Sequence, residues 1–184
     1  MSRAVIALAV TLSLIGACRT QQGSGAQAGR LEARWVGADT GKLSAAATAE
    51  WCAETRILEI RAVERDTGLA LALFPDVVIV EDTYPVVSPS RADSSVPSAR
   101  VALRWFGPTA ISGFQGDSGA VVLETMERGQ LSGSMKARAS SVINSDRITI
   151  IGTFEHLAVM DQSRGCIPEP PLEDGQAAET DEVD

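Results

Sequence analysis

The sequence predicts an all-β protein: a single antiparallel β-sandwich or barrel of about eight or nine strands, with disordered ends. Apolar and polar residues alternate with period two through most of the chain. Turn-forming residues interrupt this alternation at short intervals, as they do in antiparallel sandwiches and barrels. Hydrophobic residues make up 45% of the 184 residues, which is enough for one buried core.

The first predicted strands lie between residues 31 and 74. Residues 31–35 and 58–62 alternate apolar and charged side chains, and residues 69–74 form an all-apolar run. Asp66-Thr67-Gly68 before that run predicts a tight hairpin turn, because Asp and Gly tolerate positive φ. The alanine-rich residues 43–54 fit either a short helix or a strand, and we favour the strand.

The later predicted strands follow the same pattern, and they cover residues 77–80, 99–105, 120–126, 131–140 and 148–154. Residues 127–129 predict the turn between two of them. Residues 86–98, with two prolines and five serines, predict a long irregular loop. Gly133 and Gly152 lie inside predicted strands, where glycine marks a bend or a bulge.

The net charge of −8 is concentrated at the C-terminus. Residues 169–184 contain seven acidic residues and no Lys or Arg, so we expect a disordered acidic tail there. Without Arg3 and Arg19, the rest of the chain holds 17 acidic and 14 basic residues. This near balance predicts no basic patch, and nucleic-acid binding through phosphate contacts is therefore not expected.

Residues 1–17 have the features of an export signal. Arg3 provides a short positive start, and residues 4–17 form an uncharged, apolar stretch of 14 residues. A membrane-spanning helix needs about 20 apolar residues, so this stretch is too short to remain as one.

The end of this segment, Ile15-Gly16-Ala17-Cys18, resembles the lipobox of bacterial lipoproteins. The resemblance implies cleavage before Cys18 and a diacylglyceryl group on its thiol, and two or more acyl chains give stable anchoring. It predicts a lipid-anchored protein of the bacterial cell envelope. Arg19 replaces the Asp that favours inner-membrane retention in enterobacterial lipoproteins, which favours the outer membrane. Residues 18–29 then form a flexible tether, and residues 30–168 form the folded domain.

Cys52 and Cys166 remain as a pair once Cys18 carries lipid. An oxidising exported compartment favours a disulfide between them, and two free thiols are the alternative. The closed loop contains 115 residues, counted from Cys52 to Cys166. Two cysteines and one distant histidine do not make a zinc site, so we expect neither a metal nor another cofactor.

Gly116-Asp117-Ser118-Gly119 resembles the nucleophile loop of trypsin-like serine proteases. That family places its histidine base upstream of the serine, whereas the single histidine here, His156, follows it. We therefore interpret these residues as a turn between strands and keep a hydrolase that uses Ser118 as the third hypothesis. His156 is in phase with the apolar residues of 150–154, so we expect it to be packed or hydrogen-bonded.

Two weaker resemblances concern the folded domain. Lipocalins place Gly-x-Trp in their first strand, whereas residues 32–35 read Glu-Ala-Arg-Trp and lack that glycine. The strand pattern, the Trp51-Cys52 pair and the run 152–154 followed by Cys166 are similar to uncharacterised exported β-domains of bacterial lipoproteins. This likeness implies a fold class and no activity.

These observations predict a membrane-anchored, non-enzymatic module that binds an envelope component or another protein. The alternative is a carrier of a small apolar ligand, with an aliphatic cavity inside a β-barrel of lipocalin-like architecture. The two hypotheses differ in where the ligand binds, on the outside of the domain or within it.

Overall fold

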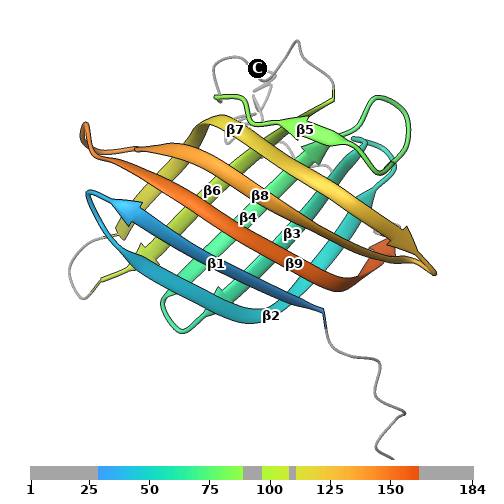
Figure 1. The fold of residues 1–184 in the computed structure, drawn as a ribbon, viewed down its shortest axis with the longest axis horizontal. Coiled ribbons are helices and arrows are strands. Elements are labelled where there is room, and N and C mark those ends of the chain that lie inside the picture. Colours follow the sequence, from blue (N-terminus) through green and yellow to red (C-terminus); the bar gives the residue numbers. More distant parts are fainter. Residues whose placement is uncertain (1–28, 89–96, 108–110, 162–184) are drawn as a thin grey trace, which may run out of the picture.

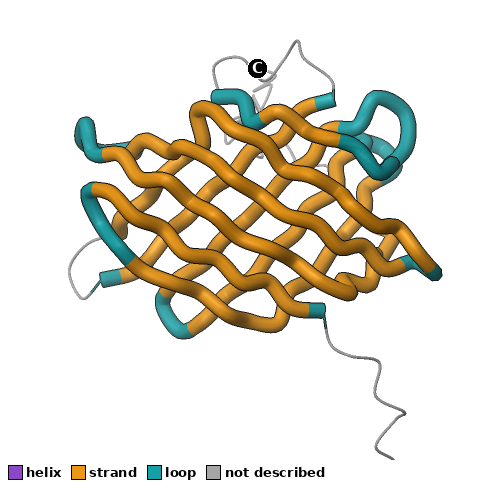
Figure 2. Tube along the Cα trace, in the orientation of Figure 1, coloured by secondary structure: helices purple, strands orange, loops and turns teal. Residues whose placement is uncertain are grey.

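The computed structural model describes residues 29–88, 97–107 and 111–161. Within these ranges the chain forms strands and turns and no helix, as Figure 2 shows. The strands run in the order β1 (Arg30–Gly37), β2 (Gly41–Cys52), β3 (Ile57–Glu64), β4 (Thr67–Phe74), β5 (Thr83–Pro85), β6 (Ser98–Phe106), β7 (Ile111–Glu127), β8 (Gln130–Ser141) and β9 (Arg147–Asp161). The all-β prediction is confirmed.

Eight of these strands close into an antiparallel barrel (Figure 1). Apart from the short β5, each strand pairs with the one before it in the chain, and β9 returns to pair with β1. The extra strand β5 pairs with residues 120–122 of β7, beyond the part of β7 that pairs with β6. Closure pairs both edges of every long strand, which removes the exposed edges of an open sheet.

The barrel has two distinct ends. We call the end at which β1 begins and β9 finishes the terminal end; Cys52, the last residue of β2, lies there too. We call the opposite end the aromatic end, because three aromatic rings stack across it. The ring centroids of Trp35 and Trp105 are 6.2 Å apart, and those of Trp105 and Phe114 are 5.2 Å apart.

The alternation of the sequence determines which side chains fill the barrel. In β8, for example, Leu131, Met135 and Ala137 are buried while Lys136 and Arg138 are exposed. The inward side chains of all nine strands form one buried cluster. An eight-stranded barrel is just wide enough for its own side chains to fill.

Two glycines let large rings lie flat against the barrel wall. Trp35 packs over its cross-strand partner Gly41, and Phe154 packs over its partner Gly133. A Cβ atom on Gly133 would lie 2.6 Å from the Phe154 ring and 2.1 Å from the carbonyl oxygen of Val122. Gly133 also borders a register shift between β8 and β9, as expected for a glycine inside a strand.

Several local predictions need correction. The alanine-rich segment is a strand, as favoured, but residues 77–80 form part of a loop in which Val77, Val78 and Val80 are exposed. That run lacks the alternation of a barrel strand and follows Pro75. The short strand β5 and the first half of β7 were not predicted, because glycine and polar residues dilute their patterns.

The β3–β4 turn also differs from its prediction. Glu64 pairs with Thr67, so the turn consists of Arg65 and Asp66, and the positive φ of 55° belongs to Arg65 rather than to a glycine. Gly68 lies within β4 instead. The β7–β8 turn is as predicted, with positive φ at Arg128 and Gly129.

Tyr84 of β5 ties the 75–82 loop to the barrel, since its hydroxyl donates a 3.0 Å hydrogen bond to the Val80 carbonyl. Burial raises the pKa of this phenol above its ordinary value of 10.0. In the unfolded chain the phenol ionises first, so the stabilising contribution of the neutral phenol is fully present below that value. It should then fall as the pH rises from about 10 towards the folded pKa.

We therefore expect Tyr84→Phe to cost about 0.5–1.5 kcal/mol near neutral pH, through loss of the hydrogen bond, and to reduce the alkaline decline. Urea unfolding of both proteins at several pH values measures this. Tyr84 is the single tyrosine, so its absorbance titration reports on this group alone. An alkaline decline of equal size in both proteins would contradict the assignment.

Candidate binding surface

The interior of the barrel is filled. Leu31, Ile60, Leu71 and Phe154 have no exposed surface, and all members of the buried cluster are at most 6% exposed. A cavity large enough for a ligand would leave accessible surface on the side chains that line it. The accessible surface that a ligand could bind therefore lies mainly on the outside of the barrel.

Two adjoining hollows of about 360 and 690 Å³ lie on the outer face of β1, β7, β8 and β9. Both are lined by Val36, Ser118, Arg138 and Thr149. These four residues form one row across the sheet, because Val36 pairs with Thr149, Thr149 with Arg138, and Arg138 with Ser118. We call the combined hollow the basic groove, defined by Val36, Asp117, Ser118, Ala120, Lys136, Arg138, Arg147, Thr149 and Ile151.

A β-bulge shapes the β7 side of the groove. The register between β7 and β8 shifts between Gly116 and Ser118, so that Asp117 has no partner opposite it. Gly119 has a φ of 120°, and a Cβ atom there would lie 2.1 Å from the Lys136 carbonyl oxygen. Only glycine fits this position, and bulges of this kind re-aim the neighbouring side chains.

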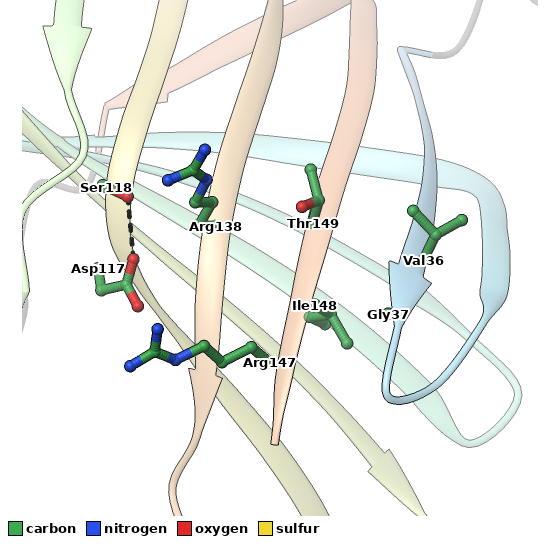
Figure 3. A pocket seen from close by; sticks show the side chains of 8 residues that line it. All are labelled: Val36, Gly37, Asp117, Ser118, Arg138, Arg147, Ile148 and Thr149. Carbon is green, nitrogen blue, oxygen red and sulfur yellow. Dashed lines mark hydrogen bonds between the residues drawn. The ribbon is translucent and has the colours of Figure 1, made fainter. Parts of the chain in front are cut away.

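Cationic side chains dominate the groove (Figure 3). Arg138 extends towards β7, and Arg147 reaches from β9 across β8 in the same direction. Lys136 lies in the next row, between Ile151 and Ala120. Among the residues that line the groove, Asp117 is the single acid, and its carboxylate accepts hydrogen bonds from the hydroxyls of Ser118 at 3.0 Å and Ser140 at 2.7 Å.

The groove cations have no ion-pair partner within the described ranges, where the ion pairs are Arg30–Glu32 and Arg61–Glu59. The floor between the cations is partly apolar, with Val36 54% exposed and Ile151 37% exposed. The groove therefore offers three positive charges, exposed hydroxyls and a small apolar floor to a ligand. That combination suits an anion with some apolar character.

The neighbouring hollow of about 590 Å³, across β1 and β2, is electrostatically different. Its cations Arg30, Arg34 and Lys42 are accompanied by the carboxylates of Glu32 and Glu64. Hydrogen bonds from the Ser44 hydroxyl and from Arg30 hold the pKa of Glu32 below its ordinary value, so this carboxylate stays charged. The balance of charges makes this hollow less attractive to anions than the basic groove.

The charge count along the chain gave no sign of this local cluster of cations, and the expectation of no nucleic-acid binding stays a prediction. That count averages over the whole chain, whereas Lys136, Arg138 and Arg147 occupy exposed positions of two adjacent strands. The sequence carried a signal for this, since Lys136 and Arg138 already fell on the predicted polar face of residues 131–140. The pairing of β8 with β9, which brings Arg147 alongside, was not predictable from that pattern.

The Gly116–Gly119 motif is not a turn between strands, because it lies within β7 at the bulge. Ser118 is far from His156: on β9, the residue level with Ser118 is Thr149, seven residues from His156, or about 23 Å along a strand. His156 is exposed rather than packed, with a φ of 54°, and its backbone N–H donates to the Ser132 hydroxyl. This irregularity turns Leu157 inward in its place.

Of the predicted disulfide pair, the structure describes Cys52 alone. Its side chain is buried at the terminal end, and it is not a free thiol. Cys18 and Cys166 lie outside the described residues, as do the signal segment 1–17, the tether up to residue 28 and the tail 169–184. The lipid anchor and the Cys52–Cys166 bridge therefore stay predictions.

The described residues contain neither a cluster of metal-binding side chains nor a membrane-spanning helix. No group of three or more His, Cys, Asp or Glu residues gathers there in a way that could hold a metal ion. No helix in this part of the chain is long and apolar enough to cross a bilayer.

Comparison of the chain with protein-family models, with curated proteins and with solved structures found no match. The eight long strands, each paired with the next along the chain, place the fold in the class of up-and-down β-barrels. Lipocalins are one example of that class. Because one fold hosts many functions, the fold alone assigns none to this chain.

Proposed function

We propose that this chain is a lipid-anchored lipoprotein of the bacterial cell envelope whose barrel is a non-enzymatic binding module. The observation that carries the binding assignment is the contrast between a filled interior and a basic groove on the outside. The lipid anchor rests on the lipobox resemblance at residues 15–18. The barrel begins at Arg30, so a tether of about a dozen residues would separate it from the lipid.

Because the interior is filled and the groove lies outside, a carrier with an internal ligand is the alternative that the structure favours less. An eight-stranded barrel suits a carrier by architecture, but the residues of the buried cluster are at most 6% exposed, which leaves little surface for an internal ligand. Native mass spectrometry of the full chain, extracted from its own membranes in mild detergent, separates the two hypotheses. We expect no small-molecule adduct apart from the lipid on the chain, whereas a stoichiometric apolar adduct would favour the carrier.

The anchor is tested by metabolic labelling with a fatty-acid analogue in the host bacterium. The wild-type chain should incorporate the label, and Cys18→Ser should lose it completely, because its hydroxyl does not accept the diacylglyceryl group. Cys52→Ser is the matched control and should keep the label. Label that persists in Cys18→Ser would refute the anchor assignment and leave the binding surface on the barrel unaffected.

A further inference from the structure

The basic groove has the opposite charge to a segment of its own chain. Lys136, Arg138 and Arg147 face one carboxylate, Asp117, and no described carboxylate forms an ion pair with them. The chain as a whole has a net charge of −8, and most of that charge is concentrated at its C-terminus. Residues 169–184 contain seven acidic residues and no Lys or Arg, which is the charge pattern that this groove would attract.

The connection between the two is short enough for contact. The C-terminal segment continues from Asp161, the last residue of β9, and β9 itself lines the groove at Arg147, Thr149 and Ile151. From Asp161 back to Ile151 is ten residues of strand, or about 33 Å. The 23 residues after Asp161 can span up to about 75 Å, so residues 169–184 reach the groove even if Cys166 is held near Cys52.

We propose that the acidic C-terminal segment, residues 169–184, docks on the basic groove of its own barrel and competes there with other anions. This inference rests on the proposed function, because it takes the outside of the barrel as the binding surface. Individual exposed ion pairs are weak and are screened by salt. A tethered segment nevertheless acts at an effective concentration in the millimolar range, so weak contacts suffice to keep it docked for much of the time.

The lysines of the chain provide a direct test. The sequence contains two lysines. Lys136 lies in the basic groove, and Lys42 lies in the neighbouring hollow across β1 and β2. A carbodiimide joins a carboxylate to a lysine amine in direct contact, and mass spectrometry of the digested protein identifies the joined residues. In the full chain, the yield of links from residues 169–184 to Lys136 should exceed that to Lys42 several-fold.

Neutralising the two arginines of the groove should abolish this preference while leaving the reporting lysine intact. In the double variant Arg138→Gln/Arg147→Gln, the yield of links to Lys136 should fall to the yield of links to Lys42. Arg104→Gln, which removes an exposed cation from β6, is the control and should preserve them. Raising the ionic strength to about 1 M, where the Debye length is about 3 Å, should also suppress the links.

The other outcomes overturn the proposal in distinguishable ways. Equal yields at both lysines, or links that are insensitive to the double variant, would show that the segment has no preference for the groove. Links that form only between two chains, and vanish on dilution, would make a second copy the occupant. If the links are absent but vesicles with anionic lipid bind through Arg138 and Arg147, the groove serves a membrane surface and the proposed outside binding surface survives.

Discussion

Phe154→Ala should reduce the free energy of unfolding by about 3–5 kcal/mol, a loss that would unfold a marginally stable domain. The Phe154 side chain is fully buried, and its ring lies against Gly133, which has no side chain to fill the vacated space. The surrounding wall is a continuous hydrogen-bonded sheet, so it has little freedom to collapse into the cavity. Chemical denaturation followed by circular dichroism measures the loss.

Ile151→Ala on the same strand is the matched control. Its side chain points outward and is 37% exposed, so we expect a loss well below 1 kcal/mol. If the two variants lose similar stability, the assignment of an inner and an outer face to β9 is incorrect. Gly133→Ala should also be destabilising, since the added carbon would meet the Val122 carbonyl oxygen at 2.1 Å.

Removing the predicted bridge with Cys52→Ser/Cys166→Ser should cost about 2–5 kcal/mol, because the bridge closes a loop of 115 residues. The structure supports this pairing on the side of Cys52. Near the terminal end, β2 and β9 meet in parallel and Trp51 pairs with Asp161, which brings Cys52 beside the exit of β9. Cys166 follows Asp161 by five residues, and five residues of extended chain span at most about 17 Å.

The double variant avoids leaving a single reactive thiol. Guanidinium unfolding of the wild-type chain with and without a reductant provides an independent measurement, and reduction should shift the midpoint to that of the double variant. A midpoint that reduction leaves unchanged would mean that the two cysteines are not joined. A Cys18→Ser background excludes any contribution from the anchor cysteine.

Local patterns predicted the strands better than their arrangement. Period-two alternation in residues 131–140 and 148–154 identified β8 and β9 and the inward side of each, because one face of each strand is buried. It did not decide between a sandwich and a closed barrel, since closure depends on which distant strands meet. Residues 77–80 misled the prediction because an apolar run without alternation also occurs in a loop.

The candidate binding surface was harder to predict for the same reason. The basic groove combines side chains from four strands, and its shape depends on a bulge at Asp117. In the sequence, the glycine and serine residues around this bulge resemble a turn. Charge counted along the chain averages over both faces of each strand and over distant segments. Outward positions counted strand by strand would have revealed three cations on β8 and β9.

The position of β1 also determines how the barrel responds to mechanical load. β1 lies between β2 and β9 and is hydrogen-bonded to both along its length, and it is the first strand after residue 29. A pull on Arg30 directed along the axis of this strand would load the hydrogen bonds of both ladders in shear, so that they share the force. A pull directed across the strand would instead break these hydrogen bonds one at a time.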